Sequence, residues 1–270
     1  MTRQNEYLPA LWDAHRVTAT TCAALLAPLA LAIHERGAGI MAPLVLALGL
    51  AVFWPLVFAR MRGRAMGWDS IVTALVFVLL LPGPVALWQQ GLALSFGLVL
   101  GGLIFGGHGR GFLNPAVAGL AFLLFSFPGA AIEVPGPSVA IAAGVGGALL
   151  LGLGLLSWRV VLGFGIAIAG LMAVFPASEG WVALQSASLV LGLVFLIGDP
   201  VAAACTNVGR WLYGGLAGTL VVMLGHAGDG VGALTTVVFA AFLASIFAPL
   251  IDQLVITLNV QRRARRQRNG

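Results

Sequence analysis

The residues best suited to chemistry lie in two polar stretches that interrupt apolar segments. One stretch is Gly198-Asp199-Pro200, which follows an apolar run and leads to Thr206 and Asn207. Proline removes a backbone donor and crowds the preceding turn, so a helix must kink or end here. A carboxylate beside freed backbone groups in or near a membrane is costly without partners. The pattern therefore predicts a ligand site, and a loop with an ordinary capping aspartate is the alternative.

The second polar stretch runs from His108 to Pro115. Its Asn-Pro pair predicts a helix start, with Asn114 as the cap and Pro115 in the first turn. Backbone donors at that start, with Arg110 nearby, would suit a phosphate, a flavin ring edge or a quinone carbonyl. A plain capping role for Asn114 and a loop role for His108 remain open. The sequence contains no metal-ligand spacing, Ser/His/Asp arrangement or Walker loop, so it does not support hydrolytic chemistry.

Both stretches belong to a pattern that the chain carries twice. ALVFVLLLPGPVALW at residues 74–88 resembles GLVFLIGDPVAAA at residues 192–204, and His108 and His226 lie 118 positions apart. Phe127-Pro128 is answered by the run from Phe247 to Pro249. Paired, proline-interrupted apolar segments in two halves of a chain indicate a site at the repeat interface. Coincidence within an apolar composition is the alternative to an internal duplication.

The composition predicts an all-α polytopic membrane protein. Of 270 residues, 60% are hydrophobic and 9% are charged, against roughly 25% charged residues in soluble domains. The 37 glycines fit helices that pack through small faces. The net charge of +5 comes with arginines in short loops, a topology signal and not a nucleic-acid footprint. Cys22 and Cys205 are the two cysteines, and they predict neither a disulfide nor an iron–sulfur site.

We expect about ten transmembrane helices in two inverted five-helix repeats. Residues 1–137 would hold a polar N-terminal arm and the first repeat, and residues 138–270 the second repeat and a basic tail. An odd number of spans in each repeat forces the second copy to be inverted. Each expected span has a length that can cross a bilayer or break within it. The expected spans are 17–33, 38–59, 70–88, 91–107, 112–128, 138–156, 160–176, 181–198, 208–225 and 232–258.

The charged residues fix the expected orientation. With the N-terminus inside, thirteen of the fourteen arginines fall on the cytoplasmic side and only Arg36 falls outside. This distribution satisfies the positive-inside rule. It places both termini in the cytoplasm. We expect a protein of the bacterial inner (plasma) membrane, and the sequence shows no signal-peptide pattern. The tail arginines would anchor lipid headgroups, with a soluble partner as the alternative.

Three groups of residues resemble one known family. They are Gly111–Ala116 with Phe125–Pro128, Gly198–Val201 with Thr206–Gly214, and Ile246–Asp252 with Asn259–Arg263. Their order and spacing resemble the membrane subunit family shared by two redox pumps. One pump is the sodium-translocating NADH:quinone reductase, through its B subunit. The other is the Rnf ferredoxin:NAD oxidoreductase, through its D subunit.

The resemblance implies a urea-transporter-like bundle with broken helices. It implies a membrane component that holds flavin within the membrane and passes electrons toward quinone or a partner, linked to ion movement. Other subunits would supply the iron–sulfur and nucleotide-binding chemistry, the lipid bilayer would surround the chain, and no nucleic acid is involved. The residues expected to line or shape the non-covalent cofactor site are Asn114, Pro115, Asp199, Pro200, Thr206, Asn207 and Arg110.

One departure from the family pattern concerns the covalent flavin. Typical members carry Ser-Gly-Ala-Thr in the outer loop between the repeats, and its threonine receives a flavin mononucleotide. Here the loop at residues 129–137 reads GAAIEVPGP and has no threonine. We therefore expect no covalent FMN, and at most a non-covalent flavin (riboflavin or FMN) or a quinone. The competing interpretations are a small-solute channel or transporter and a cofactor-free assembly subunit.

Overall fold

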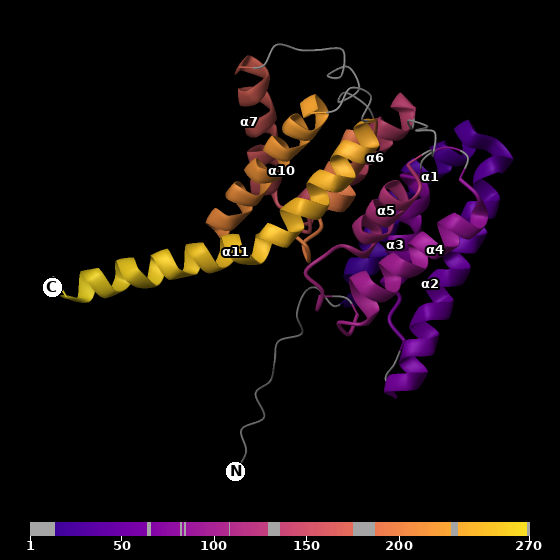
Figure 1. The fold of residues 1–270 in the computed structure, drawn as a ribbon, viewed down its shortest axis with the longest axis horizontal. Helices are drawn as coiled ribbons and strands as arrows, with labels where there is room; N and C mark the ends of the chain where they lie inside the picture. Colours follow the sequence, from indigo (N-terminus) through magenta and orange to yellow (C-terminus); the bar gives the residue numbers. More distant parts are fainter. Residues whose placement is uncertain are drawn as a thin grey trace.

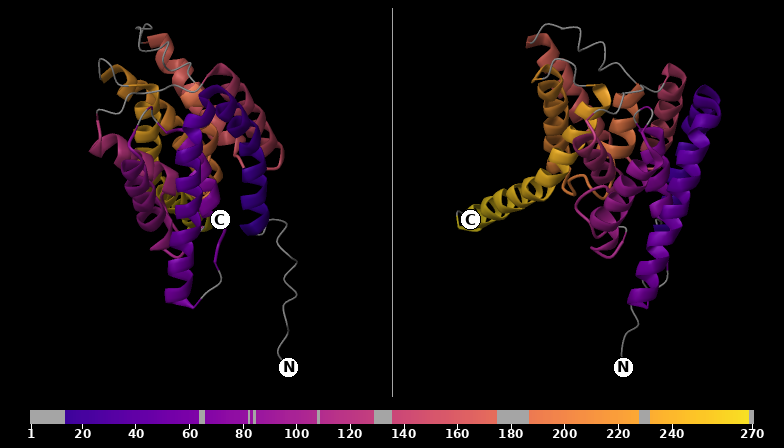
Figure 2. Two further views of the ribbon diagram at one scale, coloured as in Figure 1. Left: turned by 90° about the vertical axis from the view of Figure 1, so that its right-hand side faces the viewer. Right: turned by 45° about the vertical axis from the view of Figure 1, so that its right-hand side comes forward.

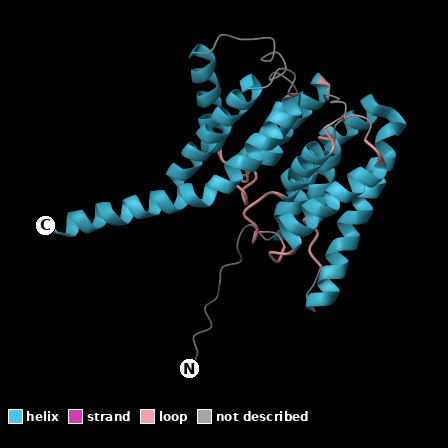
Figure 3. Ribbon diagram, in the orientation of Figure 1, coloured by secondary structure: helices cyan, strands magenta, loops and turns pink. Residues whose placement is uncertain are grey.

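The fold is that of a computed structural model, which describes residues 14–63, 66–81, 83, 85–107, 109–128, 136–174, 187–227 and 232–268. These residues form helices joined by loops and turns, with no strand among them (Figure 3). The expectation of an all-helical chain is thereby confirmed for this part of the sequence. The start of the N-terminal arm, His108, the loop at 129–135 and the first residues of the span expected at 181–198 lie outside the described residues.

The first half begins with a helical hairpin. A short 3₁₀ turn, η1 (Gly37–Ile40), joins α1 (Ala14–Arg36) to α2 (Met41–Arg62), and Gly37 takes a positive φ of 59° that this reversal requires (Figure 2). The remaining elements of this half are α3 (Ser70–Leu79), α4 (Leu87–Leu98), the π-helix η2 (Val99–Leu103) that continues α4, and α5 (Pro115–Ser126).

The described residues of the second half form five helical stretches. They are α6 (Pro137–Gly152), α7 (Trp158–Val174), α9 (Ala187–Gly192) continued by the π-helix η3 (Leu193–Ile197), α10 (Asn207–Ala227) and α11 (Ala233–Arg268). Helices α7 and α10 pack along each other, and α10 also packs against α11. Figure 1 shows α11 bending away from the bundle toward the C-terminus.

Two expected spans differ from the structure. The span expected at 70–88 is divided, because α3 ends at Leu79 and α4 begins at Leu87. Pro82 and Pro84 lie between them in the sequence, and proline cannot continue a helical hydrogen-bond pattern. The last helix, expected to end at 258, continues to Arg268, so the basic tail is helical.

The two halves meet through helices in matching positions. Helix α1 packs against α6, and α5 packs against α11. Within each half the first helix contacts the third (α1 with α3, α6 with α9), and the fourth contacts the fifth (α4 with α5, α10 with α11). The internal duplication and its inversion remain predictions, and these contact pairs agree with them.

The described helices suit a membrane. Three stretches are long and apolar enough to cross a bilayer: 15–62, which contains both α1 and α2, then 207–226 and 233–261. The other apolar helices have 10–17 residues. Large apolar side chains lie exposed on the bundle surface, as a lipid environment requires, among them Leu26, Val45, Phe53, Ile141 and Val174. The number of ten spans remains a prediction.

Two glycines let α4 and η2 pack tightly against the start of α5. A Cβ atom on Gly97 would lie 2.8 Å from the backbone nitrogen of Gly119. A Cβ atom on Gly101 would lie 2.8 Å from the Cα atom of Pro115. Side chains at these positions would therefore push α5 away from η2. This close approach fixes the beginning of α5 beside the cavity described next.

Candidate functional site

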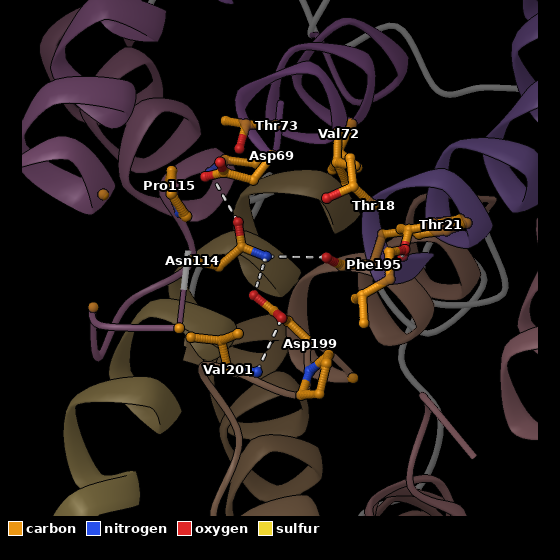
Figure 4. Close-up of a pocket in the computed structure, with 18 of the residues that line it drawn as sticks. Thr18, Thr21, Asp69, Val72, Thr73, Asn114, Pro115, Phe195, Asp199 and Val201 are labelled. Atoms are coloured by element: carbon orange, nitrogen blue, oxygen red, sulfur yellow. Dashed lines mark hydrogen bonds between the residues drawn. The ribbon is translucent and has the colours of Figure 1, made fainter. Parts of the chain in front are cut away.

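A cavity of about 100 Å³ lies where the two halves meet. The first half contributes the beginnings of α1, α3 and α5, together with η2 and the glycine-rich loop that follows η2. The second half contributes the end of α6, the loop after it, η3 and residues 198–201. Figure 4 shows polar side chains from both halves converging on this space.

Asn114 links the two halves at the edge of the cavity. Its Oδ1 atom accepts the backbone N–H of Ala116 at 2.8 Å, so Asn114 caps α5, which begins at Pro115. The capping role predicted from the Asn-Pro pair is confirmed. Its Nδ2 group donates to the carbonyl of Phe195 at 3.2 Å and to Oδ2 of Asp199 at 2.9 Å. The side chain is only 8% exposed, so these bonds lie largely out of solvent.

Asp199 occupies the point where the helix of the second half breaks. The π-helix η3 ends at Ile197, and the N–H of Gly198 closes its last turn by donating to the carbonyl of Leu193 at 2.8 Å. The Oδ1 atom of Asp199 accepts the backbone N–H of Val201 at 3.1 Å, while its other oxygen accepts from Asn114. The carboxylate thus holds the broken segment in a tight turn and joins it to the first half.

The wall of the cavity combines polar and apolar groups. Thr18 and Thr21 of α1 and Asp69 and Thr73 at the start of α3 supply hydroxyl and carboxylate oxygens. The apolar part comes from both halves and includes Val72, Val76, Leu150, Leu156, Val194 and Phe195. Among the described residues that line the cavity, the charged ones are Asp69 and Asp199, one from each half.

This charge pattern defines what the cavity can accept. The oxygens of Asp69 and Asp199 can accept hydrogen bonds from donor groups of a guest. A flat ring with N–H or O–H groups would place its donors against the oxygens and its faces against the valines and Phe195. Quinone carbonyls would need donors, and the hydroxyl of Thr73 is one candidate.

Both π-helices border the cavity. Gly101 and Gly102 of η2 and Val194 and Phe195 of η3 are among the lining residues. A π-helical turn is rare and occurs often at functional sites. Two such turns that line one cavity support its choice as the candidate site.

Four of the seven residues predicted from the sequence line this cavity: Asn114, Pro115, Asp199 and Pro200. Arg110 does not, because its exposed side chain lies beside Gly106, where an added Cβ would be 3.0 Å from the guanidinium. Thr206 and Asn207 lie at the start of α10, outside the cavity lining. The predicted cofactor contacts of all seven residues remain predictions.

Thr206 belongs to a separate cluster that attaches α11 to α10. Its hydroxyl accepts the N–H of Gly209 at 3.1 Å, which caps α10, and donates to Oδ1 of Asp252 at 2.6 Å. The same carboxylate accepts the backbone N–H groups of Cys205 at 2.7 Å and Thr206 at 2.9 Å. A Cβ on Gly209 would lie 2.6 Å from Asp252 Oδ1, so only glycine permits this approach.

The sequence-based prediction missed Asp69 and the threonines of the cavity wall. Asp69 directly precedes an apolar helix, as Asn114 does, so a search for polar residues before every apolar segment would have found it. Thr18 and Thr21 lie on the first turns of α1, and nothing local separates them from other polar residues at a membrane edge. Among the described residues no grouping of three or more His, Cys, Asp or Glu side chains could hold a metal ion.

The fold and the site define a class of protein: a helical membrane protein whose cavity forms where broken helices of two chain halves meet. Comparison with known families gives the assignment. The model of the NQR2, RnfD, RnfE family matches residues 2–138 and residues 129–261. The chain belongs to this family, and the resemblance inferred from its motifs is confirmed.

Three relatives that were compared with the chain carry the same subunit name. The chain is similar to the B subunit of the Na(+)-translocating NADH-quinone reductase of Pseudomonas aeruginosa, with 33% identity over 274 residues covering 81% of this chain. The corresponding subunits of Ectopseudomonas mendocina and Yersinia pestis are 30% and 29% identical, each over 79% of this chain. The chain spans 66% of the length of the Pseudomonas aeruginosa protein.

Proposed function

We propose that the chain is a membrane subunit of an electron-transport complex of the NADH:quinone reductase or Rnf type. In this proposal the site between the halves opens beyond its cavity of about 100 Å³ to hold a non-covalent flavin or a quinone, and it passes electrons between partner subunits, with a link to ion translocation. The observation that carries the proposal is the cavity itself, in which Asp69, Asn114 and Asp199 face an apolar wall in a member of this redox family.

The chemistry of the wall favours an uncharged ring system. The N–H edge of an isoalloxazine can donate to a carboxylate, while the ring faces pack against Val194 and Phe195. The candidates are therefore riboflavin and FMN, with a quinone as the other candidate. In this site Asn114 positions Asp199 and orders the start of α5.

The rest of the proposed assembly follows from what the chain lacks. The loop at 129–137 contains no threonine, so we propose that no FMN is attached there. The chain has no iron–sulfur ligand set and no dinucleotide-binding motif in its sequence, so partner subunits would supply both. We place the complex in the bacterial inner membrane with both ends of this chain in the cytoplasm, in accord with its arginine distribution.

The first test is a visible absorption spectrum of the protein purified in mild detergent with its partner subunits. Flavin absorbance that moves to the supernatant on acid precipitation supports a non-covalent site, and fluorescence that stays in the pellet contradicts the proposed absence of a covalent flavin. Asp69→Asn and Asp199→Asn should each lower flavin occupancy severalfold. Asn259→Ala, on the exposed end of α11, is the matched control and should leave occupancy unchanged.

The second candidate is a small-solute channel or transporter. The observation that favours it is the meeting of broken helices from two halves around one cavity, which is also transporter architecture. A folded, colourless protein that passes a small solute in proteoliposomes would support it. A colourless protein that purifies with redox subunits would instead indicate an assembly subunit without a cofactor.

A further inference from the structure

The C-terminal part of α11 leaves the helical bundle. Figures 1 and 2 show α11 running down through the bundle and then bending, so that its end projects away from the other helices. Pro249 lies near the middle of its 36 residues, and proline is the usual cause of such a bend. We call residues 250–268 the distal segment of α11.

The beginning of the distal segment is fixed at the start of α10. Asp252 accepts the backbone N–H groups of Cys205 and Thr206, immediately before α10 begins at Asn207. Beside this point Trp211 of α10 packs edge-to-face on Trp158 of α7, with ring centres 5.5 Å apart, and Arg159 lies over the Trp158 ring at 4.7 Å. Tryptophan and arginine together at helix ends are typical of the membrane–water interface. The distal segment therefore begins at the level of the interface.

The part of α11 before the bend is long enough to cross the membrane by itself. Residues 233–249 number seventeen, and their helical rise is about 26 Å. The hydrocarbon core is about 30 Å thick, and the shortest spans have about 17 residues. The distal segment therefore adds at most about one turn to the crossing.

Several large apolar side chains of the distal segment are exposed, although Val255 is buried. Leu254 is 64% exposed, Leu258 is 53% exposed and Val260 is 60% exposed. Leu250, Leu254 and Leu258 recur every four residues, so they share one face of the helix. A helix projecting into water would expose this face entirely, whereas a helix lying in the interface would bury it among lipid chains.

The charge of the distal segment selects the lipid. After Asp252 the sequence contains no acidic residue and five arginines, at positions 262, 263, 265, 266 and 268. A helix with an apolar face and a cluster of arginines lies in the membrane interface and is held there by anionic headgroups. We propose that the distal segment is an interfacial helix that binds anionic phospholipid on the side of the membrane where α10 begins. This proposal is independent of any cofactor in the cavity.

The test places a fluorescent reporter on the distal segment of the full chain. Cys22 and Cys205, the two cysteines of the sequence, are first replaced by Ala. A single cysteine then carries the environment-sensitive dye NBD, either at Leu254→Cys on the apolar face or at Asn259→Cys, which lies about 140° away around the helix. Each protein is placed in lipid nanodiscs of phosphatidylcholine alone or with phosphatidylglycerol added at roughly one lipid in three, enough to give an anionic surface.

The expected result is blue-shifted emission and severalfold protection from iodide at position 254, but not at 259, in the phosphatidylglycerol discs. Each arginine near an anionic surface contributes about fivefold to attachment. Arg263→Gln with Arg266→Gln should therefore weaken attachment about 25-fold and return the emission toward that of the dye in water. Full quenching at 254 in phosphatidylglycerol discs would overturn the proposal. Protection at position 254 that is unaffected by lipid charge and by removal of the arginines would also overturn it. Protection that appears only in discs holding two copies of the protein would do the same.

Discussion

Replacing Asn114 by Ala removes three hydrogen bonds that meet at one side chain. The variant loses the cap on the Ala116 N–H and the bonds to the Phe195 carbonyl and the Asp199 carboxylate. A lost cap costs about 1 kcal/mol, and side-chain bonds between membrane helices cost about 0.6–1.7 kcal/mol each. The expected loss of stability is about 2–4 kcal/mol.

Thermal unfolding of the purified protein in detergent measures this loss. An apparent Tm lower by roughly 4–16 °C is expected, because 1 kcal/mol corresponds to about 2–4 °C in a chain of this size. Asn259→Ala is the control, since Asn259 is exposed on the distal segment. A Tm for Asn114→Ala within about 1 °C of the unchanged protein would refute the conclusion that Asn114 joins the two halves.

A second substitution separates the cap from the link between the halves. Asn114→Asp keeps an oxygen that can cap α5 but replaces the donor that faces Asp199 with a second carboxylate. Two adjacent carboxylates repel each other unless one is protonated. The variant should therefore have a lower apparent Tm than the unchanged protein although α5 keeps its cap. An unchanged Tm would show that the contact with Asp199 does not stabilise the fold.

Three further predictions concern the packing around the cavity and the α10–α11 contact. Gly101→Val should displace the start of α5 and lower flavin occupancy, since its Cβ would lie 2.8 Å from Pro115 Cα. Gly102→Ala is the milder control, because there the nearest Pro115 atom is 3.2 Å away. Visible absorption measures the flavin occupancy of both variants. Asp252→Ala should lower the apparent Tm by several degrees, because three donors at Cys205 and Thr206 lose their acceptor. Arg62→Ala should make the loop after η2 more susceptible to limited proteolysis, because its guanidinium binds the carbonyls of Leu103 and Ile104 at 2.7 and 2.9 Å.

Local signals predicted the ends of the elements well. An asparagine before a proline specified the capped start of α5, and Gly198-Asp199-Pro200 specified the end of the helix in the second half. Both rules depend on neighbouring residues alone. The apolar composition likewise specified helices, because a backbone in lipid must satisfy its own hydrogen bonds.

Contacts between distant residues could not be predicted in the same way. Asn114 donates hydrogen bonds to Phe195 and Asp199, which lie 81 and 85 positions further along the sequence. The residues around a helix cap do not indicate which distant acceptor its side chain will bond. The place of Asp69 in the cavity depends on how α3 packs, which its own sequence does not state. The π-turns of η2 and η3 also depend on the close packing that surrounds them.

The hydrogen bond from Asn114 to Phe195 bears on the order in which the protein folds during its synthesis. Synthesis proceeds from the N-terminus, so the donor leaves the ribosome 81 residues before its acceptor. During that interval the first half can insert and pack its own helices, but the amide has only water or transient partners. The Asn114 side chain acquires its partners in the second half when residues 195–199 arrive. All described residues that line the cavity have therefore been made once Val201 is synthesised, before α10 and α11 follow.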